Sequence, residues 1–356
     1  MKDLHDLDWD TILDYIDSEQ AALLIGPEVM HFDGQPMNKA WRGQIWDKFR
    51  AKIAYYYEQD GLFLFSNKIA KNDAARFVRK FVNEREPEEA VYQKIAQIKF
   101  PLVVSINPDT YLSDVAHKYG VRHRFSYFKS RSKATDDVEE PQKELPLFYN
   151  LCGVVNDDES IILDYEDLFR LIASSVSAPG LPPKLQTALD KVRLFLFIGF
   201  QFENWHTQLL LRLLCGQEQT EKYAASRQHV DDDTRDFLLH QFQIEFLEKD
   251  QSFLDALHDK CRSRNLLRPL ANPASAEEID IIKLIQTGKD LAAPLDVLRR
   301  QTDNTPVAHE ATLLMGRYNS LMEEKSKGVM DSRDYFVEYN RLIDAILTTA
   351  RQAAAL

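Results

Sequence analysis

The segment RLFLFIGFQFENWHTQLLLRLL, residues 193–214, gives the clearest indication of the fold class. An unbroken apolar run ends near Gly199, a short polar stretch follows, and leucines at helical spacing come next. A continuous apolar run of this length before a turn is typical of a strand that is buried on both faces. The segment therefore predicts a buried strand that leads into a helix, the repeating unit of α/β proteins.

The same pattern recurs on both sides of this segment. Further buried strands are predicted in AALLIGPEVM (21–30), FPLVVSINPD (100–109), PLFYNLCG (146–153) and FQIEFLE (242–248). Apolar residues at helical spacing predict helices within 8–20, 36–86, 110–120, 164–175 and 184–192. Strands that alternate with helices predict a doubly wound, Rossmann-like α/β domain with a parallel sheet.

Three of the predicted strands end in residues that favour turns. Gly26-Pro27 follows the first strand, Asn107-Pro108-Asp109 follows the second, and Gly199 follows the fourth. Parallel strands bring their carboxyl ends to one edge of the sheet, where ligands of such folds bind. This edge is predicted to hold a nucleotide, although the G-x-G-x-x-G signature is absent.

The character of the chain changes at RPLANPASAEE (268–278), and the residues beyond it show helical spacing without a strand signal. Ser275 with Glu278 forms a capping-box pattern, and Asp331-Ser332 precedes the last predicted helix. We predict an α/β domain over residues 1–270 and a small all-α helical bundle over 275–356. No polar constellation in the bundle suggests catalysis, so we interpret it as an interaction module.

The composition excludes several classes of protein. A net charge of −12 argues against a general nucleic-acid binder, since phosphate binding needs a basic surface. The basic run 117–133 is interpreted as a solvated loop in preference to a phosphate-facing flap. Cys152, Cys215 and Cys261 have spacings that suit neither a zinc site nor a disulfide framework. The acidic start of the chain and the short apolar runs predict a cytoplasmic protein that binds neither metal nor membrane.

The ordered strand ends resemble the bacterial SIR2-like domain, a sirtuin-related fold of phage-defence proteins, over about residues 15–265. SINPD corresponds to the TTNxD-type motif, NLCG to the xHG motif, and FIGF to the GxS-type strand end. The tail GRYNSLMEEKSKGVMDSRDYFVEYNRLIDAILTTA (316–350) resembles an effector-associated, death-like adaptor domain. Such modules join effectors to sensor proteins that carry a similar module.

The resemblance implies that NAD is the substrate, because the SIR2 family breaks its nicotinamide–ribose bond. It places Asn107 at the ribose and the attacking water, and it implies that Asp109 orients the loop or contacts nicotinamide. The implied NAD contacts are Gly26 and Pro27 at the phosphates, Gly199 and Phe200 on the adenosine side, and Gly153 after the third strand.

Cys152 stands where this family has a histidine that acts as the base. An imidazole titrates near neutrality, whereas a thiol titrates near ~8.5 unless its surroundings change that value. Cys152 is therefore either a weak base or nucleophile beside a cation, or a small buried residue, and the second interpretation is favoured. Water positioned by Asn107 supports hydrolysis in both cases, since water that attacks an oxocarbenium-like sugar needs less base assistance than a ribose hydroxyl does.

Other residues are alternatives for the missing base or for the pocket rim. His31, His117, His123 and His206 are candidate bases, and His31 and His206 are the first to test. Glu203 and Asn204 are predicted either to lie on the pocket rim or, as the favoured interpretation, to cap the following helix.

Two functions follow from the resemblance. The first is an NAD hydrolase that acts as an effector of bacterial anti-phage immunity when its tail is recruited or clustered. The expected partners are further copies of the chain, in an oligomer or filament, and a protein with a matching effector-associated domain. The second is a pseudoenzyme that keeps a nucleotide pocket and acts as a scaffold. A linear and a cyclic ADP-ribose product remain open.

Overall fold

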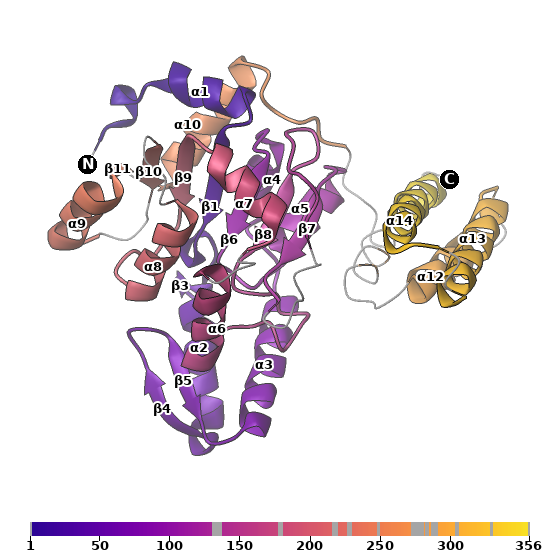
Figure 1. Ribbon diagram of the computed structural model, residues 1–356, viewed down its shortest axis with the longest axis horizontal. Coiled ribbons are helices and arrows are strands. Elements are labelled where there is room, and N and C mark those ends of the chain that lie inside the picture. Colours follow the sequence, from indigo (N-terminus) through magenta and orange to yellow (C-terminus); the bar gives the residue numbers. More distant parts are fainter. Residues whose placement is uncertain are drawn as a thin grey trace. The chain divides into compact units, whose positions relative to one another are not determined.

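The computed structural model describes residues 2–129, 137–176, 181–215, 220–225, 230–247, 250–271, 281, 285, 291–302, 306–327 and 330–354. The chain divides into two compact units (Figure 1), one of Met1–Val115 with Arg122–Pro269 and the other of Ala116–Val121 with Leu270–Leu356. Each unit has its own hydrophobic core.

A seven-stranded parallel sheet forms the centre of the first unit. Among the described residues its order is β11-β10-β9-β1-β6-β8-β7, and every neighbouring pair is parallel. The strands are β1 (Ala21–Ile25), β6 (Leu102–Ser105), β7 (Arg124–Tyr127), β8 (Leu147–Asn150), β9 (Leu194–Ile198), β10 (Glu221–Ala225) and β11 (Ile244–Leu247). The predicted doubly wound α/β class is therefore confirmed.

Helices cover both faces of this sheet. Alternate strand residues such as Leu24 and Phe197 share one core with α6 (Tyr165–Val176), α7 (Pro183–Lys191), α8 (Trp205–Leu214) and α9 (Asp232–Phe242). The residues next to them, such as Leu23 and Leu196, point to the opposite face. There α1 (Trp9–Asp17) contacts β1 and α10 (Asp250–Ser263) contacts β10. Burial of both faces explains why these strands read as continuous apolar runs.

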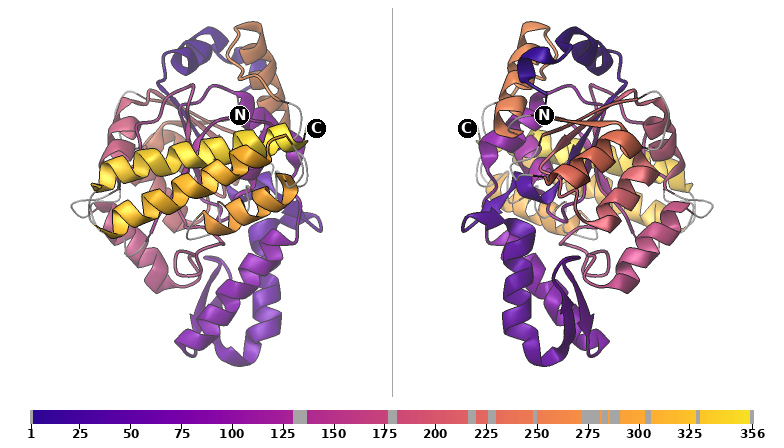
Figure 2. Two further views of the ribbon diagram at one scale, coloured as in Figure 1. Left: turned by 90° about the vertical axis from the view of Figure 1, so that its right-hand side faces the viewer. Right: turned by 90° about the vertical axis from the view of Figure 1, so that its left-hand side faces the viewer.

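A long insertion separates β1 from β6 and extends away from the sheet (Figures 1 and 2). It contains η2 (Pro27–Val29), β2 (His31–Phe32), β3 (Gln35–Pro36), α2 (Met37–Phe49), η3 (Arg50–Lys52), β4 (Ile53–Tyr57), β5 (Leu62–Phe65), α3 (Lys68–Asn83) and α4 (Glu89–Gln97). The prediction of helix throughout 36–86 is wrong over 53–65, which form an antiparallel hairpin. Aromatic residues favour strands here, and Gly61, with φ +66°, closes the turn.

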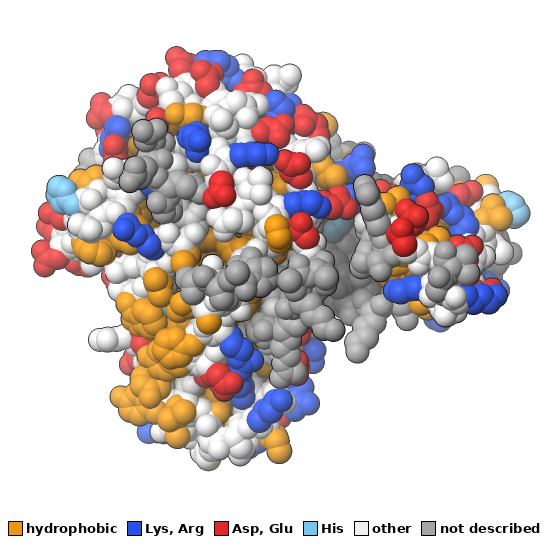
Figure 3. Space-filling view, viewed as in Figure 1, with side chains coloured by type: hydrophobic (Ala, Val, Ile, Leu, Met, Phe, Trp, Pro, Cys, Tyr) orange, Lys and Arg blue, Asp and Glu red, His pale blue; other side chains and the backbone are white. Residues whose placement is uncertain are grey.

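The insertion carries an exposed hydrophobic surface, which is orange in Figure 3. Tyr55 and Leu64 are at least half exposed, as is Phe169 of α6. Tyr57 packs edge-on against Tyr165, whose ring stacks on that of Phe169. The surface therefore joins the hairpin to α6.

Two further strands, β7 and β10, were not predicted from the sequence. β7 lies within the basic run 117–133, so the interpretation of that whole run as a solvated loop is wrong. It is an edge strand that pairs with β8 alone, and its partly exposed residues carry no buried-strand signal. β10 lies between β9 and β11 but begins with the charged residues Glu221 and Lys222, so it contains no continuous apolar run.

The C-terminal unit is helical in its described part. Its main helices are α12 (Ala292–Thr302), α13 (Ala308–Ser326) and α14 (Ser332–Ala354). Two further helices of the described residues are α5 (Tyr111–Lys118) and η1 (Leu4–Asp6). Leu298, Leu314 and Ile346 lie in its apolar core. Asp331 caps α14 by accepting a 2.8 Å hydrogen bond from the Asp334 amide, as predicted. The predicted cap at 275–278 lies outside the described residues.

Candidate functional site

The turns after three strands meet at the carboxyl edge of the sheet. β1 lies between β6 and β9, so Gly26, Asn107 and Gly199 follow neighbouring strands. The Gly26 amide donates to the Ile198 carbonyl over 2.8 Å, and Asn107 Nδ2 donates to the Gly26 carbonyl over 3.0 Å. The predicted convergence of these strand ends is therefore present in the structure.

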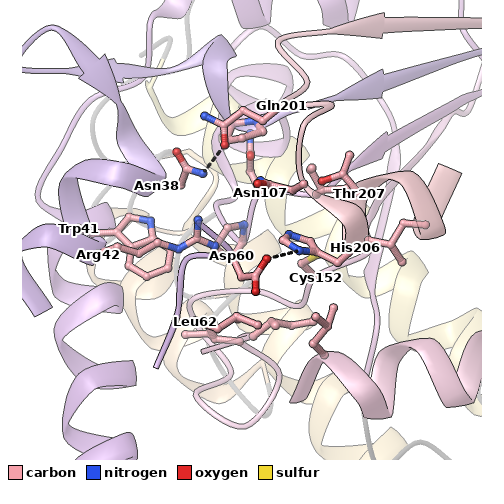
Figure 4. Close-up of a pocket in the computed structure, with 18 residues that line it drawn as sticks. Asn38, Trp41, Arg42, Asp60, Leu62, Asn107, Cys152, Gln201, His206 and Thr207 are labelled. Atoms are coloured by element: carbon pink, nitrogen blue, oxygen red, sulfur yellow. Dashed lines mark hydrogen bonds and ion pairs between the residues drawn. The ribbon is translucent and has the colours of Figure 1, made fainter. Parts of the chain in front are cut away.

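A pocket opens beside this junction (Figure 4) and holds about 720 Å³ of empty space, including its solvent-open part. Its walls come from three sources: the strand ends, the insertion after β1, and helices α6 and α8. The polar lining residues are Asn38, Trp41, Arg42, Asp60, Asn107, Cys152, Gln201, Asn204, His206 and Thr207. Asn107, Cys152 and Pro27 are the predicted site residues among the lining.

Asn107 is buried, and its position is fixed by two hydrogen bonds. Its backbone amide donates to Ser105 Oγ over 3.1 Å, and its side-chain Nδ2 is engaged by Gly26. The carbonyl oxygen Oδ1 has no partner within the described part of the chain. The side chain therefore offers the pocket a hydrogen-bond acceptor, suited to a hydroxyl group or a water.

Glycine is required at positions 26 and 199 because the turns that contain them are in close backbone contact. A Cβ added to Gly26 would lie 2.2 Å from the Gly199 carbonyl oxygen. Gly199 has φ +69°, which favours glycine. The Gly26 amide is used by the sheet, Pro27 has no amide hydrogen, and the Glu28 amide donates to Gly199 over 2.9 Å. This turn leaves no amide of these three residues to bind a phosphate.

Two other predicted NAD contacts lie outside the pocket lining. Gly153 has φ +82°, and a Cβ there would lie 2.1 Å from the Ser160 carbonyl oxygen, so a close backbone contact requires glycine. Phe200 is buried and packs edge-on against Phe197 in the core. Neither residue faces the cavity, and direct contact with NAD stays a prediction for both.

Asp109 is not among the residues that line this pocket, and it lines a small separate cavity together with Tyr92 and Asn150. Its Oδ1 accepts a 3.1 Å hydrogen bond from the Tyr111 amide, and its carbonyl accepts one of 2.6 Å from Asn150 Nδ2. Burial raises the pKa of Asp109 to about 7. Of the two roles predicted for Asp109, these contacts favour orientation of the loop over contact with nicotinamide.

Cys152 lines the pocket as a half-buried thiol. Burial raises its pKa to about 12, although the nearby Arg42 cation acts in the opposite direction. The thiol is therefore protonated at neutral pH, and the thiolate needed for a base or nucleophile is not available.

His206 is the histidine that the structure brings into the pocket. It lies in the first turn of α8, its side chain is 16% exposed, and its Nδ1 is 4.0 Å from Asp60 Oδ1. Tyr165 donates a short hydrogen bond to the other oxygen of Asp60. Burial, followed by the Arg42 cation, lowers the pKa of His206 to about 4, against the effect of Asp60. His206 is therefore neutral at physiological pH and able to accept a proton.

The remaining alternatives differ in position. His31, His117, His123 and the exposed Glu203 are not among the residues that line the pocket. Asn204 occupies the N-cap position of α8, but its side chain makes no capping hydrogen bond and lines the pocket instead. The favoured prediction of a side-chain cap is therefore wrong for Asn204.

Several enclosed polar atoms of the lining lack partners within the described residues. They are Trp41 Nε1, Arg42 Nε, Gln201 Nε2 and His206 Nδ1. Gln201 uses its other amide atom, since Oε1 accepts a 3.3 Å hydrogen bond from Asn38 Nδ2. Unsatisfied polar atoms are costly in a folded protein, and their concentration in one cavity indicates a polar ligand.

Sequence reasoning missed six of the polar lining residues, which are Asn38, Trp41, Arg42, Asp60, Gln201 and Thr207. Gln201 directly follows the FIGF strand end and was within reach of the motif. Asn38, Arg42 and Asp60 belong to the insertion, where no spacing pattern links them to the strand ends. No group of three potential metal-ligating side chains and no helix able to cross a membrane occurs in the described part of the chain.

Comparison with protein families agrees with this architecture. A model described as SIR2-like domain matches residues 101–247, from the start of β6 to the end of β11. A model described as Effector-associated domain 11 matches residues 280–353. No match was found among curated proteins. The chain therefore carries a SIR2-like domain followed by a C-terminal effector-associated domain, as its sequence motifs predicted.

Proposed function

We propose that the α/β unit hydrolyses the bond between nicotinamide and ribose in NAD. The main support for this proposal is the pocket at the carboxyl edge of a SIR2-like sheet. Asn107 Oδ1 has no hydrogen-bond partner among the described residues and can accept a hydrogen bond there. The unpartnered polar atoms of Gln201 and His206 in the same cavity support a polar ligand of this kind.

The proposed reaction breaks the bond between the ribose carbon and the nicotinamide nitrogen, and neutral nicotinamide leaves with the bonding electrons. Asn107 Oδ1 accepts a hydrogen bond from the attacking water, or from a ribose hydroxyl, and fixes its approach. The new bond joins the water oxygen to the ribose carbon. The water proton passes to the neutral imidazole of His206, whose Nδ1 lies 4.0 Å from Asp60 Oδ1. Cys152 stays a neutral thiol.

The effector-associated domain supports a role in defence. We propose that this domain recruits the hydrolase to a protein with a matching domain, or clusters copies of the chain, during bacterial anti-phage immunity. Consumption of NAD is then the effector action. The acidic chain and the separate helical unit support recruitment by protein in preference to nucleic acid.

Nicotinamide release by the concentrated full chain tests this proposal. Asn107→Ala should lower the rate by about 100-fold or more, because it removes the group that positions the water. His206→Gln should lower it by about 100-fold, the lower range for a general base. Cys152→Ser should change it by less than about threefold, as expected for a thiol that takes no proton. Equal rates in wild type and Asn107→Ala would contradict the proposal.

A nucleotide-binding scaffold is the second candidate. The protonated thiol at the position of the family's histidine favours it. NAD that binds saturably to the full chain, without nicotinamide release alone or with a partner of the effector-associated domain, would select the scaffold.

A further inference from the structure

Arg42 is a pocket residue whose positive charge has no counter-charge. It lies on α2, lines the cavity, and its Nε is enclosed without a hydrogen-bond partner. No carboxylate forms an ion pair with it among the described residues. Asp60 lies in the same cavity, but its carboxylate is engaged by Tyr165 and faces His206 (Figure 4).

The surroundings hold this guanidinium in place. Gly61 leaves room for it, since a Cβ there would lie 2.3 Å from Arg42 Nη1. The Arg42 Cζ also lies 4.9 Å from the centroid of the Trp41 ring. Burial lowers the pKa of Arg42, which shows that its charge is poorly solvated. A poorly solvated cation without a carboxylate partner among the described residues is costly, and an anionic ligand would offset that cost.

The turn after β1 offers no backbone amide to a phosphate. The amides of Gly26 and Glu28 are used within the protein, and Pro27 between them has none. A phosphoryl group beside this turn therefore needs donors from elsewhere, and a side-chain cation supplies them together with a compensating charge. A guanidinium binds phosphoryl oxygens bidentately, which suits Arg42 to this role.

We propose that Arg42 is a phosphoryl-binding residue of this pocket, contributed by the insertion and lying outside the matched SIR2-like segment. Two sources share this chemistry: the diphosphate of a dinucleotide and free inorganic phosphate. The inference rests on the proposed function where the diphosphate of NAD is the source. Neutralising Arg42 should also raise the pKa of His206, because the Arg42 cation is one of the causes that lower the pKa of that imidazole.

Equilibrium binding to the full chain tests this proposal without requiring turnover. Calorimetry with ADP-ribose, inorganic phosphate and nicotinamide riboside, which lacks a phosphate, would compare wild type, Arg42→Gln and Arg42→Lys. Lys39→Gln is the matched control, since it removes an exposed cation from the same helix outside the pocket lining. Histidine NMR titration of each variant would show that the pocket is intact and follow His206.

Arg42→Gln should weaken ADP-ribose binding by about 10- to 100-fold, as expected for a lost charge-assisted contact, and Arg42→Lys should weaken it less. Lys39→Gln should leave it unchanged, and nicotinamide riboside should bind no more weakly to Arg42→Gln than to wild type. The pKa of His206 should rise in Arg42→Gln and, on addition of ADP-ribose, in wild type.

The other outcomes separate this inference from the proposed function. If inorganic phosphate binds in an Arg42-dependent manner and ADP-ribose does not bind, the inference stands with free phosphate as the source and the NAD proposal fails. If ADP-ribose binds wild type and Arg42→Gln equally well, the inference is overturned and the NAD proposal stands. Absence of binding by all three compounds would overturn both.

Discussion

The buried histidine of the pocket gives the sharpest prediction about stability. The pKa of His206 is about 4 in the folded protein, compared with an ordinary value of 6.5. Its side chain is 16% exposed, so solvent screens this difference little. A shift of about 2.5 units corresponds to roughly 3 kcal/mol between the two protonation states.

The sign follows from proton binding in each state. Above pH 6.5 the imidazole is neutral in both states and adds no pH dependence. As the pH falls from 6.5 to 4, the unfolded chain binds a proton at His206 while the folded chain does not. Wild type therefore loses free energy of unfolding across this window, and His206→Gln removes that loss. Between pH 7 and 4.5 the variant should gain roughly 2 kcal/mol relative to wild type.

Urea unfolding followed by tryptophan fluorescence measures this effect. All four tryptophans lie at or before residue 205, so the signal reports on the α/β unit. His240→Gln is the matched control, because it removes an exposed histidine from α9. If His206→Gln and His240→Gln show the same pH dependence relative to wild type, His206 is not held neutral by the pocket. The proposed base would then lose its electrostatic support.

Three further predictions address the fold. Gly199→Ala should lower the free energy of unfolding by more than about 2 kcal/mol, because alanine is strained at φ +69°. Gly316→Ala, in an open helical position, should raise the free energy of unfolding by about 1 kcal/mol. Equal changes for the two variants in urea unfolding would contradict this. Burial raises the pKa of Asp109 to about 7, so wild type should lose stability as the pH rises from 3.8 to 7. Between pH 5 and 8, the free energy of unfolding of Asp109→Asn should therefore gain roughly 2–3 kcal/mol relative to wild type. Parallel pH profiles of the two proteins would refute this. Removal of 275–356 should abolish higher-order assembly and leave the α/β unit folded, and light scattering that finds unchanged assembly would exclude the tail as the assembly module.

The sheet could be predicted where strands are buried on both faces. The strands β1, β6, β8, β9 and β11 carry apolar runs, and their ends brought Asn107 and Cys152 to the right edge. β7 and β10 could not be found in this way. The edge position of β7 and the charged residues Glu221 and Lys222 of β10 remove the apolar signal on which the prediction depends.

The chemistry of the pocket was less accessible from sequence. Arg42 and Asp60 belong to an insertion, and no local pattern shows that its helix and hairpin fold back beside the strand ends. His206 was named as a base to test, but its protonation state depends on burial and on Arg42, which only the folded chain brings near. Glycines were assigned to ligand contact, whereas Gly26 is required by contact with another backbone turn.

A crystal structure of the full chain grown with saturating NAD would show where the nucleotide binds. We predict nucleotide density in the pocket between the strand ends and α8, with a ribose hydroxyl or a water within hydrogen-bond distance of Asn107 Oδ1. NAD bound at another surface, or a cavity that stays free of nucleotide at saturating NAD, would contradict it.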